Sequence, residues 1–158
     1  MLVGSVGPGI EKRATLPEPL VEFLAGPGLS WISSVPPLWR RFHTATSRVA
    51  FSPDPVPNWY LTQLEANFAR PHTLDTFRSE GRDLGGEADL DPNPIEVPML
   101  VIQGDEDRLI PRAIGEEIHT RAPQSTLQVI PHAGHMLPIT HAALLADAIA
   151  NFVAHDQR

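Results

Sequence analysis

The C-terminal part of the chain carries the pattern that most restricts its fold, in which two apolar strands alternate with two amphipathic helices. Residues 98–103 form a continuous apolar run, as in a strand buried on both faces of a parallel sheet, and residues 125–130 alternate as in a second strand. Pro111 fits the first turn of a helix with Ile114 and Ile118 on one face. The final helix has an apolar stripe formed by Leu145, Ala148, Ile149, Phe152 and Val153. This order predicts an α/β fold with a parallel sheet covered by helices.

The first 97 residues are expected to form two further parts. Residues 1–10 are a short apolar run followed by glycine and proline, which predicts the end of a core strand at Leu2 and Val3 and the loop after it. Residues 11–97 hold most of the 17 prolines and show no strand-like alternation, so we expect several short helices that make a lid or insertion. Residues 98–158 are then the core β-α-β-α segment.

Within residues 11–97, periodicity predicts three short helices. One covers the apolar run at 20–24, another extends from about residue 57 to residue 70, and a third follows Pro71. The apolar positions between residues 31 and 39 have mixed helical spacing and are interrupted by two prolines. Residues 80–97 are acidic and rich in glycine and proline, which predicts a connecting loop.

Composition excludes several classes of function. The chain has 12 basic and 19 acidic residues and a net charge of −7, which argues against a nucleic-acid partner because such proteins need a basic surface. No apolar run is long enough to span a membrane, and we expect a cytoplasmic protein. The absence of cysteine excludes disulfides, thiolate metal sites and a cysteine nucleophile.

Reactive side chains follow both predicted core strands. The sequence Gly104-Asp105-Glu106-Asp107 comes directly after the first strand, and Gly134-His135 follows the second. Because the carboxyl ends of adjacent parallel strands meet at one edge of a sheet, an aspartate in one loop can accept the Nδ1 proton of a histidine in the other. Such a contact fixes the imidazole tautomer and stabilises the imidazolium that forms when the other ring nitrogen takes a proton.

The two segments V-P-M-L-V-I-Q-G-D-E-D-R-L-I-P and V-I-P-H-A-G-H-M-L-P resemble the last two strands and loops of the α/β-hydrolase superfamily. The resemblance covers about residues 97–155 and implies that Asp107 is the acid and His135 the general base of a catalytic triad. Residues 11–97 then resemble the helical cap that many members insert before the acid strand. The expected fold is the C-terminal part of an α/β-hydrolase parallel sheet with a helical cap insertion.

Other residues near these loops have alternative interpretations. Asp105 and Glu106 fit capping or solvated acids. His132, His135 and His141 raise the possibility of zinc, but the spacing lies on a loop without the glutamate of the helical zinc motif, so we expect no metal and place His132 and His141 at a polar rim. Four aromatic residues fit either the apolar core of the cap or an acyl pocket beneath it: Trp31, Trp39, Trp59 and Tyr60.

The nucleophile of such a triad precedes the acid in the chain, at a G-x-S-x-G elbow. The nearest match is Val3-Gly4-Ser5-Val6-Gly7, in which Val3 occupies a position that needs a small residue and Pro8 follows where a helix should begin. Ser5 therefore does not fit the nucleophile. We expect the nucleophile, a serine or an aspartate, on a segment that precedes residue 1, such as a missing N-terminal half.

Two classes of function remain open. The first is a cofactor-independent hydrolase that acts on an ester or similar carbon-centred bond of a small-molecule substrate, and that is incomplete and inactive alone. The second is a non-catalytic product, either a truncated or degenerate hydrolase fragment or an interaction module.

Overall fold

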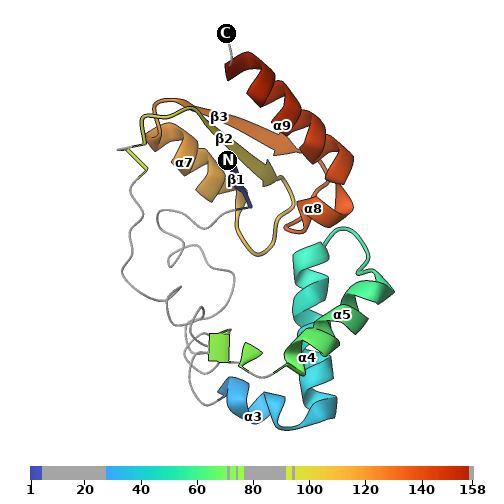
Figure 1. The fold of residues 1–158 in the computed structure, drawn as a ribbon. Helices are drawn as coiled ribbons and strands as arrows, with labels where there is room; N and C mark the ends of the chain where they lie inside the picture. The colour runs from blue at the N-terminus through green and yellow to red at the C-terminus, as the bar shows by residue number, and fades with distance from the viewer. Residues whose placement is uncertain (5–27, 71, 74, 77–91, 94, 157–158) are drawn as a thin grey trace. The chain divides into compact units, whose positions relative to one another are not determined.

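The structure is a computed structural model that describes residues 1–4, 28–70, 72–73, 75–76, 92–93 and 95–156 (Figure 1). Several sequence predictions lie outside these residues. They are the helix at 20–24, the helix after Pro71, most of the connector at 80–97 and the position of Ser5.

Three parallel strands form the sheet of the described chain, in the order β1-β2-β3. They are β1 (Leu2–Val3), β2 (Met99–Gly104) and β3 (Ser125–Ile130). Val101 and Ile102 pair with the two residues of β1, and all six residues of β2 pair in register with β3. The predicted α/β fold with a parallel sheet is confirmed.

Helix α7 (Arg112–Arg121) covers one face of the sheet. Because side chains alternate along a strand, Met99 and Val101 point to this face, where they pack with Ile114 and Ile118 of the helix. Pro111 immediately precedes α7 and is its N-terminal flanking residue, one position before the first turn in which the sequence placed it.

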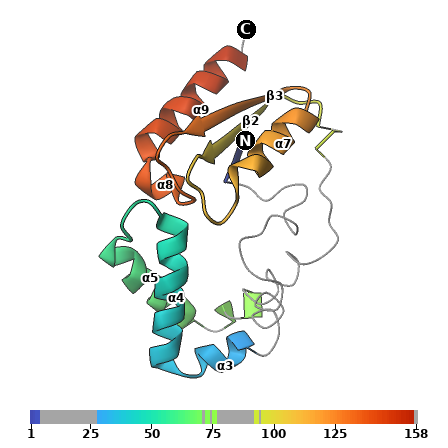
Figure 2. The same ribbon diagram turned by 180° about the vertical axis from the view of Figure 1, so that it is seen from behind.

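Helices α8 (Leu137–Thr140) and α9 (Ala142–Asp156) pack against the opposite face, as Figures 1 and 2 show from two sides. Leu100 and Ile102 point to this face and pack with Leu137 and Ala148. The predicted stripe of α9 is wrong at its last member, because the Val153 side chain is 48% exposed while the other four positions pack on the core. Helix α8 begins at Leu137, two residues after His135.

The chain divides into two compact units. The core unit comprises Met1–Ala14, Ala50–Asp54 and Asp89–Arg158, and the helical unit comprises Thr15–Val49 and Pro55–Ala88. In its described residues the helical unit contains α3 (Leu29–Ser33), α4 (Pro36–Phe51) and α5 (Asn58–Phe68), and the last two residues of α4 belong to the core unit.

Helix α4 was not predicted from the sequence, in which its two prolines were taken as an interruption of the helical spacing. Pro36 and Pro37 begin the helix, where the missing N–H of proline costs no hydrogen bond, and the helix is 16 residues long in total. Helix α5 matches the helix predicted at about 57–70 to within two residues at each end.

The four aromatic residues assigned to a cap core or pocket do not share one environment. Trp39 packs edge-on against Phe68, with ring centroids 4.6 Å apart. Trp31 and Trp59 are about 60% exposed, so the described part of the chain buries neither of them in a core. Trp59 contacts only its neighbour Tyr60 among the ring pairs described.

Among the residues that the structure describes, no helix has the length and hydropathy that crossing a bilayer requires.

Candidate functional site

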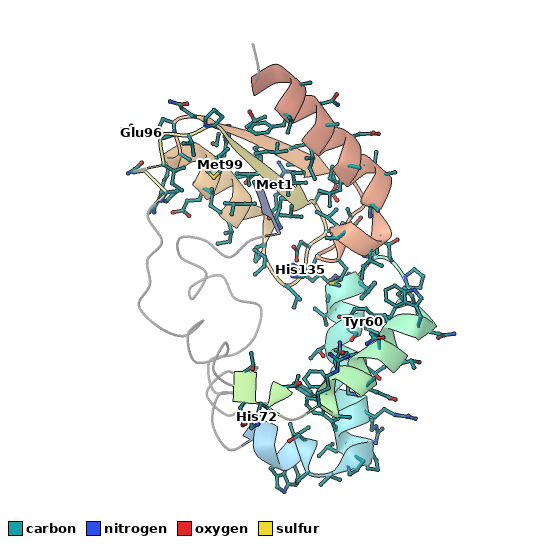
Figure 3. All side chains as sticks on the ribbon, in the orientation of Figure 1. Met1, Tyr60, His72, Glu96, Met99 and His135 are labelled. Atoms are coloured by element: carbon teal, nitrogen blue, oxygen red, sulfur yellow. The ribbon has the colours of Figure 1, made fainter. Side chains whose placement is uncertain are left out.

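The two loops expected to carry the chemistry lie at the carboxyl edge of the sheet. Gly104 pairs with Ile130, so β2 and β3 end at the same level, and the loops leave the sheet side by side. Figure 3 places the labelled His135 at this end, toward which the strands point. In parallel α/β sheets this edge is where functional groups gather.

Backbone contacts hold the acid loop against the histidine loop. The Asp105 N–H donates to the Ile130 carbonyl at 3.1 Å, and the Glu106 N–H donates to the Ala133 carbonyl at 3.0 Å. A Cβ atom on Gly104 would lie 2.2 Å from the Ala133 oxygen, so only glycine permits this approach. The glycine that ends β2 therefore sets the distance between the two loops.

The structure brings Asp107 and His135 together. Nδ1 of His135 lies 3.0 Å from Oδ2 of Asp107, and because the carboxylate can only accept, the ring nitrogen donates. The Asp107 side chain is fully buried, whereas the His135 side chain is 28% exposed. Nε2 of His135 makes no hydrogen bond to the residues described here, so it is available to a reacting group.

Three further hydrogen bonds hold the Asp107 carboxylate. Oδ1 accepts from the backbone N–H groups of Leu109 and Ile110, each at 2.9 Å. Oδ2, which contacts His135, also accepts from Nε2 of Gln103 at 3.0 Å. Each oxygen therefore accepts two hydrogen bonds, and both the direction and the charge of the buried carboxylate are stabilised.

The neighbouring acids, Asp105 and Glu106, contact residues other than His135. Oδ1 of Asp105 accepts a long hydrogen bond from the Ala133 N–H at 3.4 Å, which helps to join the loops. Glu106 contacts Nδ1 of His132 at 3.2 Å, and the His132 side chain is 86% exposed. Neither acid contacts His135.

The contacts of His141 are with other residues than Asp107 and His135. Its Nδ1 lies 2.8 Å from the Thr140 hydroxyl and 3.7 Å from Oδ2 of Asp54. The three histidines considered as a zinc site thus have no side-chain partner in common. Within the described ranges, no three His, Asp or Glu side chains are placed to hold a metal ion.

Two further segments of the core unit support His135. Its backbone N–H donates to the Ala50 carbonyl at the end of α4, at 3.2 Å. Gly4 follows β1 with φ of +50°, and a Cβ atom there would lie 3.3 Å from Nδ1 of His135. The glycine after β1 leaves room for the imidazole.

Gln103 is a site residue that the sequence analysis missed, because it was taken as part of an apolar strand. It is only 1% exposed, and its amide contacts Asp107. A polar side chain inside a strand buried on both faces was the available signal, since such a group needs a partner.

The helical unit contains a cavity of about 290 Å³, lined in part by Trp39, Arg40, His43, Glu65 and Phe68. Arg40 and Glu65 form an ion pair at 2.9 Å. His43 is buried beside the rings of Trp39 and Phe68, and neither of its ring nitrogens has a hydrogen-bond partner among the described residues. Burial lowers the pKa of His43, which Glu65 partly opposes, so the ring is neutral near pH 7.

Comparison with known proteins gives matches to hydrolases. A family model for the alpha/beta hydrolase family matches residues 2–148. The chain is 36% identical over 70 residues to the uncharacterized hydrolase YugF of Bacillus subtilis (strain 168), in an alignment that covers 42% of this chain and 26% of YugF. It is 34% identical over 65 residues to the putative carbamate hydrolase RutD of Escherichia coli (strain K12 / DH10B), covering 39% of this chain and 24% of RutD.

The fold is also similar to solved structures. The esterase EaEST from Exiguobacterium antarcticum superposes with a TM-score of 0.69 at 17% identity, covering 88% of this chain and 49% of EaEST. The chain thus spans about half the length of this structure and about a quarter of the curated relatives. Since the family model covers nearly all of the sequence, the resemblance expected from the two loops is confirmed, and the chain belongs to the α/β hydrolase family.

Proposed function

We propose that Asp107 and His135 are the acid and the general base of a nucleophile–histidine–acid triad that hydrolyses an ester or similar carbon-centred bond. The observation that carries this proposal is the 3.0 Å hydrogen bond between Nδ1 of His135, whose side chain is 28% exposed, and the fully buried carboxylate of Asp107. The family match and the name of the relative RutD support a substrate with a reactive carbonyl carbon.

The geometry suits proton transfer in both halves of such a reaction. With Nδ1 protonated and directed at Asp107, Nε2 has the lone pair that can accept the proton of an attacking hydroxyl. The imidazolium that results is stabilised by the Asp107 carboxylate, and the same proton then passes from Nε2 to the leaving group. If the nucleophile is an aspartate, His135 instead activates the water that hydrolyses the covalent ester.

We propose that the nucleophile comes from a segment outside the described residues. By the order of the family's triads it precedes Asp107 in the polypeptide. The helical unit is proposed to be the cap that covers the substrate, and the substrate itself is a small molecule. No cofactor takes part in this mechanism.

The test measures hydrolysis of short-chain p-nitrophenyl esters by the protein expressed from its gene, together with any segment that the gene places before residue 1. Replacing the general base in His135→Ala should lower kcat by about 10⁴-fold or more. His132→Asn is the matched control, because His132 lies in the same loop and contacts Glu106 instead of Asp107. Asparagine tolerates the φ of +53° at position 132, so this variant should retain the wild-type rate within a few-fold.

Two outcomes would contradict the proposal. If His135→Ala hydrolyses the esters as fast as the wild type, His135 is not the base. If no form of the protein, including one mixed with its natural N-terminal segment, hydrolyses any ester, amide or carbamate offered, the non-catalytic alternative is favoured. A fluorophosphonate probe followed by mass spectrometry distinguishes the nucleophiles, because it labels serine and not aspartate.

A further inference from the structure

Among the residues that the structure describes, Gln103 is the one side chain besides His135 that donates to Oδ2 of Asp107. It lies at the fifth position of β2 and is 1% exposed. Its Nε2 carries two protons and has two acceptors, Asp107 Oδ2 at 3.0 Å and the Ile110 carbonyl at 2.9 Å. Both donors of the amide are therefore used, and the orientation of the amide is fixed.

These contacts close a ring of hydrogen bonds around the acid loop. The Ile110 N–H donates to Oδ1 of Asp107, while the Ile110 carbonyl accepts from Gln103, which in turn donates to Oδ2. The carboxylate is thus held from the loop side through Oδ1 and from the sheet side through Oδ2. Any rotation of the Asp107 carboxyl group would break at least one bond to a buried partner, which costs more than a bond at the surface.

The chemistry of an amide suits this position. A donor is needed, because a buried carboxylate without one pays a large desolvation penalty. A lysine or arginine there would supply donors but would also neutralise the charge on which the His135 imidazolium depends. The uncharged amide orients Oδ2 toward His135 and leaves the full negative charge in place.

We propose that Gln103 is a positioning residue of the Asp107–His135 pair, which acts by holding Oδ2 in the direction of Nδ1. This inference rests on the proposed function for its effect on the rate. Its structural part, the dependence of the Asp107–His135 hydrogen bond on the Gln103 amide, stands apart from catalysis.

A substitution at Gly115 of α7 is a second way to perturb the amide of Gln103. A Cβ atom at this position would lie 3.3 Å from Oε1 and 3.4 Å from Cβ of Gln103, so the glutamine would have to move by a few tenths of an ångström. Gly115→Ala should therefore displace Gln103 slightly. It should not weaken the helix, because alanine is a better helix former than glycine.

The experiment uses Gln103→Met, which keeps the length of the side chain and removes both N–H donors. In the complete protein we expect kcat for ester hydrolysis to fall about 10- to 100-fold, as for loss of one buried hydrogen bond to a charged group, with KM within about twofold. The proton NMR signal of the His135 Nδ1–H should shift or broaden by exchange with water. Ile102→Val is the control and should change neither, because Ile102 is a buried neighbour in β2 that packs in the core cluster with Leu137 and Ala148.

Unchanged kcat and an unchanged Nδ1–H signal in a folded Gln103→Met protein would overturn the proposal. If Gln103→Met does not fold, Gly115→Ala is measured instead, and an unshifted Nδ1–H signal in that variant overturns it equally. The NMR measurement needs no nucleophile. If His135→Ala shows that His135 is not the base while the Nδ1–H signal responds to Gln103→Met, the proposed function fails and the positioning role of Gln103 in the pair stands.

Discussion

Asp107 can accept four hydrogen bonds because its side chain is short and lies at the start of a turn. Its Oδ1 reaches the backbone N–H groups two and three residues further along the chain, the contact by which aspartate commonly stabilises turns. This local contact directs Oδ2 back toward the sheet, where His135 lies. Asp105 and Glu106 have the same charge but contact Ala133 and His132 of the opposite loop instead of His135, so position in the turn distinguishes the three acids.

His43 presents the opposite case, a buried polar ring without hydrogen-bond partners among the residues described. Burial lowers its pKa below the ordinary value near 6.5, with a smaller opposing effect of Glu65 and a smaller reinforcing effect of Arg40. Below that ordinary value the unfolded chain takes up a proton that the folded helical unit resists. Stability is then fully present above about pH 6.5 and is lost as the pH falls below it.

The corresponding prediction concerns His43→Leu. The variant should melt at least as high as the wild type at pH 7.5, because the two unpaired ring nitrogens are removed, and should lose less stability than the wild type on acidification to pH 5.5. Thermal unfolding followed by circular dichroism at the two pH values measures both effects. His72→Asn is the control, since the His72 side chain is 87% exposed, and its acid sensitivity should match the wild type. Equal acid sensitivity in His43→Leu would contradict the argument.

At the scale of elements, helix periodicity described the faces of the core well. The spacing of Ile114 and Ile118 predicted the face of α7 that packs on the sheet, and four of the five stripe positions of α9 pack on the other side. Val153 is exposed because it lies in the last turn of α9, where the partly buried Phe152 is the last residue that packs against the core cluster. Periodicity predicts which face of a helix a side chain is on. Whether that side chain is buried depends on how far the sheet extends along the helix.

A pair of leucines tests this assignment of faces. Leu137 of α8 is fully buried against Leu100 and Ile102, whereas Leu144 of α9 is 48% exposed. Leu137→Ala should lower the free energy of unfolding by about 2–5 kcal/mol, and Leu144→Ala should change it by no more than about 0.5 kcal/mol. Urea unfolding of the two variants and the wild type measures the difference. Similar losses in both would show that the burial of Leu137 is not maintained in solution.

At the scale of the whole molecule, the sheet has an edge that the described residues cover incompletely. Strand β1 pairs with only two of the six residues of β2, and within the ranges described no strand lies on its other side. Unpaired backbone groups at a sheet edge can pair with another chain. An added strand from a longer polypeptide would cover the same groups.

The 158-residue chain by itself is therefore expected to self-associate as its concentration rises. Sedimentation velocity at low and high protein concentration should show a shift toward dimers or larger species. If the gene encodes a segment before residue 1, the longer protein should show a smaller shift, and its mass can be measured by immunoblot with an antibody against α9. A chain that stays monomeric at every concentration would show that this edge is protected.

The amino-acid sequence alone determined the order of strands and helices in the core and the two loops that hold Asp107 and His135, because apolar periodicity and the glycines Gly104 and Gly134 are local signals. Only the tertiary structure decided that α4 continues beyond its prolines, that His43 is buried, and that Gln103 contacts Asp107. The reason is physical. The partner of a polar side chain is set by the packing of separate segments, and no local spacing encodes which donor a folded chain will bring to a given oxygen.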